Sequence, residues 1–168
     1  KLFSEILVYK SMNNIVKLII SIAIPLAAGG LSGFFTTSEI PGWYQTITKP
    51  SWNPPSWIFG PVWTTLYIMR GIALYLVWKN ETVDAGIKRT AIILFAIQMV
   101  LNFFWSLIFF KQHQIGWAFA EIIAMWIFIV LTIFAFAKVN IAAAWLLVPY
   151  ICWVSFASIL NYTIWKLN

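Results

Sequence analysis

Long apolar segments alternate with short polar ones along almost the whole chain. Five apolar stretches occupy residues 15–35, 55–78, 90–110, 115–137 and 141–165, and roughly 20 such residues cross a bilayer as a helix. Their connections are short, except for residues 36–54. A transmembrane β-barrel would need segments of about ten residues with alternating polarity, and these stretches are longer and more uniformly apolar. The pattern therefore predicts an all-α membrane protein whose single domain, residues 12–168, is a bundle of five transmembrane helices.

The composition agrees with a membrane protein. Of the 168 residues, 62% are hydrophobic and 10% are charged, whereas a soluble domain contains about 25% charged residues. The mean hydropathy is +0.86. The short connections leave no room for a soluble catalytic domain, so any function must be built from the helices and the 36–54 loop.

The distribution of basic residues predicts the orientation in the membrane. The net charge of +6 does not indicate nucleic-acid binding, because the basic residues of a membrane protein are explained by this sorting. Lys and Arg are enriched on the cytoplasmic side of membrane proteins. Seven lie on the side of the N-terminus (Lys1, Lys10, Lys17, Lys79, Lys88, Arg89 and Lys138) and three on the other side (Lys49, Lys111 and Lys166). This places the N-terminus inside, although the counts fall to five and three without residues 1–11.

The N-terminal region allows several interpretations. Residues 1–11 precede Met12 and are read as an added extension, an alternative start or a flexible N-terminus. The first apolar stretch resembles a signal peptide, with small residues at 27–30. However, it continues to Phe35 and contains Gly29-x-x-x-Gly33, a spacing typical of packed membrane helices. We therefore expect a first transmembrane helix.

Single reactive residues exclude several chemistries. Cys152 is the only cysteine, so a disulfide within the chain is impossible; a buried thiol is expected, with a crosslink to another subunit as the alternative. His113 is the only histidine, which argues against a protein-built metal site and leaves an axial haem ligand as a remote alternative. We find no nucleophile–base pair, phosphate loop or pair of catalytic carboxylates.

Residues 49–63 combine four prolines with three tryptophans. Proline restricts its own backbone and that of the preceding residue, so the segment through Pro54 is a stiff loop, and Pro55 suits the first turn of a helix. The rings of Trp52, Trp57 and Trp63 beside this loop suggest a wall for a flat aromatic ligand. We expect the 36–54 loop to act as a lid.

Four helix faces combine aromatic residues with small or amide residues at helical spacing. If the spans alternate in direction, these faces meet in one half of the bilayer below the Pro/Trp loop, and amides and acids are costly against lipid. The faces are Gly60, Trp63, Tyr67 and Gly71; Gln98, Asn102, Trp105 and Phe109; Trp117, Ala120, Glu121 and Ala124; and Trp153, Ala157, Leu160 and Asn161. We therefore predict a pocket between the helices, with helix–helix packing as the alternative for each residue.

Two charged residues lie within the predicted spans. Glu121 is about 9 Å below one membrane surface and Arg70 about 12 Å from the other, at 1.5 Å per residue. We expect Arg70 to extend toward its own surface rather than to pair with Glu121. Glu121 is then either protonated or directed into the pocket, where it would tune a polar ligand.

The chain resembles the translocator protein family, also called tryptophan-rich sensory proteins or the TspO/MBR family. The resemblance rests on Trp43-Tyr44 and on residues 49–67 (KPSWNPPSWIFGPVWTTLY), 101–106 (LNFFWS), 109–110 (FF), 116–118 (GWA) and 149–162 (PYICWVSFASILNY). It implies five helices, frequent homodimers, and a pocket for porphyrins and for synthetic aromatic amides such as isoquinoline carboxamides. Leu160, Tyr162 and Lys166 match a sterol-associated pattern, but the longer charged tail of animal members is absent. We therefore expect a protein of a bacterial cell membrane and do not expect a sterol ligand.

The resemblance implies a membrane receptor for tetrapyrroles, active in porphyrin handling and stress response, with no covalently bound cofactor. One alternative is an enzyme that degrades porphyrin in light and oxygen, with Trp63 and Trp153 relaying electrons. Another is a porphyrin or sterol transporter, although the chain shows no inverted repeat and no series of acids for proton coupling. The expected ligand-binding residues are Trp43, Phe59, Gly60, Trp63, Tyr67, Asn102, Trp105, Trp117, Ala120, Glu121, Ala124, Trp153, Ala157, Leu160 and Asn161.

Overall fold

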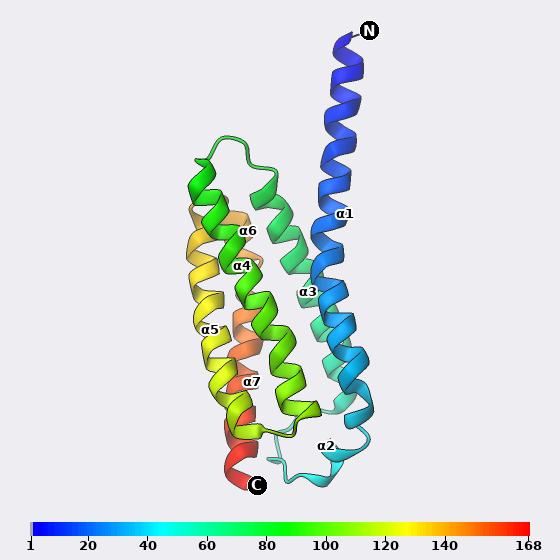
Figure 1. Cartoon of the computed structure of the whole chain (residues 1–168), viewed down its shortest axis with the longest axis vertical. Coiled ribbons are helices and arrows are strands. Elements are labelled where there is room, and N and C mark those ends of the chain that lie inside the picture. Colours follow the sequence, from blue (N-terminus) through cyan, green and yellow to red (C-terminus); the bar gives the residue numbers. More distant parts are fainter. Residues whose placement is uncertain (1) are drawn as a thin grey trace.

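A computed structural model describes the backbone of residues 2–168 and the side chains of residues 13–168. Every regular element in this range is helical, which confirms the all-α prediction (Figure 1). The elements are α1 (Leu2–Thr36), the 3₁₀ turn η1 (Thr37–Glu39), α2 (Trp43–Thr46), α3 (Ser56–Trp78), α4 (Ala85–Ser106), the π-helical turn η2 (Leu107–Lys111), α5 (Ile115–Ala137), α6 (Ile141–Trp145) and α7 (Val148–Leu167). The proposed extension, residues 1–11, lies outside the described side chains.

Four segments of the described chain are long and apolar enough to cross a membrane: Asn13–Glu39, Ala85–Lys111, Ile115–Ala137 and Ile141–Leu167. This identifies an integral membrane protein. The predicted second span forms α3, a helix of 23 residues that is not among the four. Arg70, the one charged residue of α3, lowers the mean hydropathy of this helix.

Local chemistry moved two of the predicted helix boundaries. The Asp84 carboxylate accepts hydrogen bonds from the backbone N–H groups of Gly86 and Ile87, so α4 begins at Ala85 rather than at residue 90. The last predicted span is two helices, because Pro149 has no backbone N–H and its ring clashes with the carbonyl four residues earlier, that of Trp145, where α6 ends. Pro149 lies in the first turn of α7, two residues after the break that follows α6.

The helices pack as an elongated bundle in which α1 lies beside α3, and α5 packs against α4 and α7 (Figure 1). Gly71 permits the close approach of α1 to α3: a Cβ atom there would lie 2.5 Å from the Cα of Ile22. The C-terminal end of α7 lies at the same end of the bundle as α2 (Figure 1). There the Asn168 side chain accepts from the Thr48 backbone N–H at 2.9 Å and donates to the Thr48 carbonyl at 3.0 Å.

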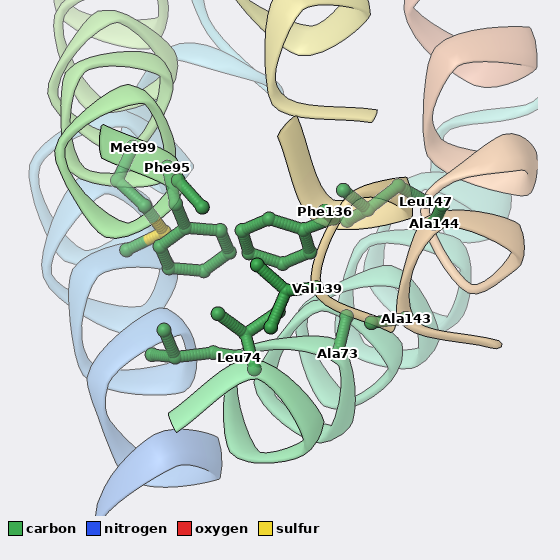
Figure 2. Close-up of a cluster of buried hydrophobic side chains, with 11 residues drawn as sticks. Ala73, Leu74, Phe95, Met99, Phe136, Val139, Ala143, Ala144 and Leu147 are labelled. Atoms are coloured by element: carbon green, nitrogen blue, oxygen red, sulfur yellow. The ribbon is translucent and has the colours of Figure 1, made fainter. Parts of the chain in front are cut away.

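One large apolar cluster fills the opposite half of the bundle, toward the 79–84 loop. It joins residues of α3, α4, α5 and α6, and Figure 2 shows Phe95 and Phe136 side by side at its centre. Their ring centroids are 5.7 Å apart and the planes differ by 15°. Ala73, Val77, Phe136 and Ala143 have no exposed surface. Apolar packing therefore holds this half of the bundle together.

Two expectations about single residues were wrong. Arg70 does not extend to the membrane surface, because its side chain is fully buried and donates hydrogen bonds inside the bundle. Cys152 is exposed rather than buried. On α7 the neighbouring Trp153 and Val154 turn toward the other helices, and the 100° step of an α-helix then directs Cys152 outward.

Candidate ligand-binding cavity

A cavity of about 470 Å³ lies between α1, α3, α4 and α7, at the end of the bundle that carries residues 37–55. Its volume is in the range of small-molecule pockets, about 300–1,000 Å³. The lining residues are Leu26, Gly29, Gly30, Ser32, Gly33, Thr36, Thr37, Ile40, Tyr44, Ser56, Phe59, Gly60, Trp63, Thr64, Tyr67, Asn102, Trp105, Ser106, Phe109, Phe110, Trp153, Phe156, Ala157, Leu160, Asn161 and Ile164.

The cavity walls are mainly aromatic. On α3, Trp63 stacks on Tyr67 with centroids 5.6 Å apart and planes 26° apart. On the opposite side, Trp105 stacks on Phe109 at 5.5 Å. Trp153 of α7 meets Phe59 of α3 edge to face at 6.0 Å. Each ring is therefore held by a neighbour, and the walls are rigid, apolar and suited to flat ligands.

Amide side chains fix these walls. Asn102 accepts a hydrogen bond from the Tyr67 hydroxyl at 3.1 Å and so joins α4 to α3. Asn161 accepts from Trp105 Nε1 at 3.1 Å and donates to the Ile115 carbonyl at 2.9 Å, which joins α7 to α4 and to the start of α5. Asn102 and Asn161 therefore both line the cavity and join helices by hydrogen bonds, so the predicted pocket role and the alternative of helix packing both hold.

Helix α1 provides the wall of small residues. Gly29, Gly30, Ser32, Gly33 and Thr36 all line the cavity. At Gly29, a Cβ atom would lie 2.0 Å from Cε2 of Tyr67, so only glycine leaves room for this ring. Gly29 and Gly33 were expected mainly to pack helices, and α1 was not among the predicted faces of the pocket. The recurrence of small residues along one side of α1 was the available signal.

The segment between α1 and α3 closes one end of the cavity. Tyr44 is buried, lines the cavity, and donates from its hydroxyl to Asn53 Oδ1 at 2.7 Å. Burial raises the pKa of Tyr44 to about 12. Lys49 Nζ donates to the carbonyls of Tyr44 and Ile47 at 2.6 and 3.0 Å. These bonds order the loop internally.

A second set of contacts fastens this segment to the turn between α4 and α5. The Glu39 carboxylate lies 3.2 Å from both Lys111 Nζ and His113 Nε2. Trp43 stacks on the His113 ring at 4.2 Å with planes 13° apart. His113 has a φ of 57°, in the left-handed region that non-glycine residues rarely adopt. Trp43 therefore anchors the loop and is not part of the cavity lining.

Beneath the cavity lies a buried polar network around Arg70. Its guanidinium donates to Gln98 Oε1 at 2.7 Å and, at a long 3.5 Å, to Asn102 Oδ1. The Tyr150 ring lies 4.2 Å from its Cζ atom. Asn102 thus contacts both the cavity and this network. Gln98 and Asn102 are both buried, which confirms the inward face predicted for the third span.

The inward face predicted for α5 was wrong. Trp117 is 73% exposed, Ala120 is exposed, and no residue of α5 lines the cavity. The buried face of α5 is entirely different: Ala118, Ile122, Met125, Ile129, Thr132 and Phe136. Helix α5 packs behind α4 and α7, away from the cavity. Because several faces of α5 are apolar, the helix can bury another face and leave the face with Trp117 and Ala120 outside.

Glu121 and Ala124 lie on the same displaced face and are partly buried. Both carboxyl oxygens of Glu121 are shielded and have no hydrogen-bond partner among the described residues. The proposed tuning of a pocket ligand by Glu121 therefore has no support from its position. Trp57 is 74% exposed and Trp52 packs on Phe156 at 5.9 Å, so of the three loop tryptophans only Trp63 lines the cavity.

Of the fifteen residues expected at the ligand, the structure brings ten together at the cavity: Phe59, Gly60, Trp63, Tyr67, Asn102, Trp105, Trp153, Ala157, Leu160 and Asn161. The other five, Trp43, Trp117, Ala120, Glu121 and Ala124, lie outside it. Fold and cavity together define a class: an α-helical integral membrane protein with an aromatic pocket between its helices.

Comparison with known sequences places the chain within that class. It belongs to the TspO/MBR family, whose sequence profile matches residues 21–166. It is 48% identical over 159 residues to the tryptophan-rich protein TspO of Chlorobaculum tepidum, covering 92% of this chain and 98% of that protein. It is 39% identical to the translocator protein of Ovis aries, over 81% of this chain and 83% of that protein. The tryptophan-rich sensory protein of Cereibacter sphaeroides is 35% identical, over 75% of this chain and 77% of that protein.

Proposed function

We propose that this protein is a membrane receptor that binds tetrapyrroles such as protoporphyrin IX, and that the same cavity accepts isoquinoline carboxamides. The observation that carries the proposal is the cavity wall of Trp63, Trp105 and Trp153. A flat apolar macrocycle gains by burying its faces against such rings, at roughly 25 cal/mol per Å² of apolar area. Membership of a family with relatives named tryptophan-rich sensory protein supports a role in sensing.

In this proposal α3 also crosses the membrane and completes a five-span bundle in a bacterial cell membrane. Its 23 residues correspond to about 35 Å of helix, enough for a hydrocarbon core of about 30 Å. Its less apolar residues do not oppose this assignment, because Gly71 packs on α1 and Arg70 is fully buried.

Tryptophan fluorescence provides a direct test of the cavity. Protoporphyrin IX should quench the fluorescence saturably, and Trp153→Ala should weaken binding at least tenfold, about 1.4 kcal/mol. Trp145→Ala is the matched control, because Trp145 is 67% exposed and lies outside the cavity. Equal weakening in both variants, or none in Trp153→Ala, would place the binding site elsewhere.

We further propose that residues 36–54 form a lid. Tyr44 lines the cavity, and the prolines at 50, 54 and 55 keep the entropy cost of closure low, since the open loop already has few conformations. Ligand should protect residues 36–54 from protease and amide exchange and leave the 79–84 loop, at the opposite end, unchanged. Replacing Pro54 and Pro55 with glycine should accelerate ligand release. An unaltered release rate would mean that these prolines serve only to begin α3 and do not stiffen the lid.

Light-dependent oxidation of the bound porphyrin by dioxygen is a second candidate function. The specific observation is that Trp63 and Trp153 line the same cavity from α3 and α7. Trp63 also packs edge to face on Tyr150, with ring centroids 6.3 Å apart. Oxidisable rings thus adjoin the space in which an excited macrocycle would lie. Illumination with and without oxygen, followed by product mass, tests the idea. If Trp63→Phe and Trp153→Phe variants bleach porphyrin as fast as the parent, the protein takes no part in the photochemistry.

A further inference from the structure

Arg70 is a positive charge inside the bundle that has no ion-pair partner in the part of the chain whose side chains are described. Its side chain is fully buried, and a guanidinium is a permanent cation. Within the described residues, ion pairs join Glu39 to Lys111 and His113, and none reaches Arg70. Glu121 does not fill this role, because within the described chain its carboxylate forms neither an ion pair nor a hydrogen bond with Arg70. A buried charge is costly unless an opposite charge or hydrogen bonds compensate it.

The hydrogen bonds around Arg70 compensate it only in part. One terminal nitrogen has a short bond to Gln98, the other has only the 3.5 Å contact with Asn102, and Nε has no partner in the described structure. Gln98 Nε2 is likewise shielded and unpartnered there. All of these unsatisfied groups are donors. The network is therefore short of acceptors as well as of negative charge.

This network lies directly beneath the cavity floor. Tyr67 and Asn102 line the cavity, and both contact Arg70: Asn102 through the long hydrogen bond, and Tyr67 through its ring, 5.5 Å from the guanidinium carbon. A single layer of side chains thus separates a ligand from the charge. The Arg70–Asn102 contact is the weakest bond of the network and is the one that a stronger acceptor would replace.

We infer that Arg70 makes the floor of this cavity a subsite for carboxylate, so that the cavity prefers aromatic ligands with an acidic group. The inference deepens the proposed tetrapyrrole function and rests on it, because protoporphyrin IX carries two propionate groups. A ligand carboxylate takes the place of the Asn102 oxygen beside Arg70 and accepts charge-assisted hydrogen bonds, which are shorter and stronger than neutral ones. The apolar surroundings strengthen the attraction further.

Two pairs of probes that differ mainly in charge test this subsite. The first is protoporphyrin IX against its neutral dimethyl ester; the second is an isoquinoline carboxylic acid against the matching neutral carboxamide. In the wild-type protein, each acid should bind at least tenfold more tightly than its neutral partner. Arg70→Met should remove that preference and leave the affinity for both neutral compounds within about twofold. Arg70→Lys, which retains the charge, should keep part of the preference. Arg89→Met is the matched control, since Arg89 is exposed and lies outside the cavity.

The outcomes separate the subsite from the proposed function. Equal affinity for acid and neutral partner in the wild-type protein overturns the inference, and this comparison needs no variant to fold. Equal weakening of all four probes by Arg70→Met also overturns it, and assigns Arg70 to joining α3 and α4. If neither porphyrin binds but the isoquinoline acid is preferred through Arg70, the tetrapyrrole function fails and the carboxylate subsite stands. If porphyrins bind without regard to charge, the function stands and the subsite fails.

Discussion

Gly29 and Gly30 provide a matched pair of substitutions that differ in one structural feature. Both glycines lie in α1 and line the cavity. An alanine Cβ at residue 29 would lie 2.0 Å from Cε2 of Tyr67, whereas at residue 30 it would meet no atom within 4 Å. Ordinary contact begins at 3.4 Å, so Gly29→Ala requires the Tyr67 ring to retreat by about 1.4 Å. Tyr67 is fixed by its stack on Trp63 and its hydrogen bond to Asn102, and such a shift disrupts both.

The magnitudes decide the sign of each substitution. Overpacking costs about 1–3 kcal/mol and a lost hydrogen bond about 0.5–1.5 kcal/mol. Replacing glycine by alanine within a helix gains about 1 kcal/mol. Gly29→Ala should therefore lower the free energy of unfolding by about 2 kcal/mol, and Gly30→Ala should raise it by up to about 1 kcal/mol. For a chain of this size, a loss of about 2 kcal/mol lowers the melting temperature by about 4–8 °C.

Thermal unfolding of the two detergent-solubilised variants, followed by circular dichroism, measures this difference. Porphyrin titration should show weakened binding in Gly29→Ala, because Tyr67 forms part of the wall, and near-normal binding in Gly30→Ala. Identical melting temperatures and affinities in the two variants would refute the packing argument. They would show that the Tyr67 ring can move without cost to the fold or the cavity.

Three further predictions concern the cavity and the segment that closes it. Asn161→Leu should lower the free energy of unfolding by about 1–3 kcal/mol, because Trp105 Nε1 and the Ile115 carbonyl lose their hydrogen-bond partner. Ser155→Ala removes the hydrogen-bond acceptor of the exposed Trp126 Nε1 and should lower it less. Equal losses in the two variants would contradict the structural role of Asn161. Glu39→Gln should speed ligand release about two- to fivefold in stopped-flow experiments, because exposed ion pairs contribute little and the contacts of Trp43 remain. Glu81→Gln, in the opposite loop, should have no effect, and an unchanged rate in Glu39→Gln would show that the contacts with Lys111 and His113 do not hold the loop. Burial raises the pKa of Tyr44 from 10 to about 12, so the unfolded chain loses this proton first and the free energy of unfolding falls as the pH rises through that interval. Tyr44→Phe should flatten this decline, and curves that run parallel to the wild type would argue against a buried phenol.

The sequence by itself determined the elements and most of the cavity walls. Apolar stretches of membrane length predicted the long helices, and the bounds of α3 and α5 match within one residue. The inward faces of α3, α4 and α7 also followed from it, because amide and aromatic side chains recur there at helical spacing and polar groups are costly against lipid. Ten of the fifteen expected ligand-binding residues lie at the cavity for this reason.

Only the tertiary structure decided how each helix is rotated when its composition allows several orientations. Almost every face of α5 is apolar enough to meet either lipid or protein, so its packing against α4 and α7 turned Trp117 outward and buried Ile122 instead. Likewise, an arginine about two turns from the end of a helix can be expected to extend its side chain to the membrane surface as long as its buried partners are unknown. Gln98, Asn102 and the Tyr150 ring provide a buried alternative for Arg70, and these residues come together only when α3, α4 and α7 pack. Periodicity is a property of one helix, whereas these positions depend on contacts between helices.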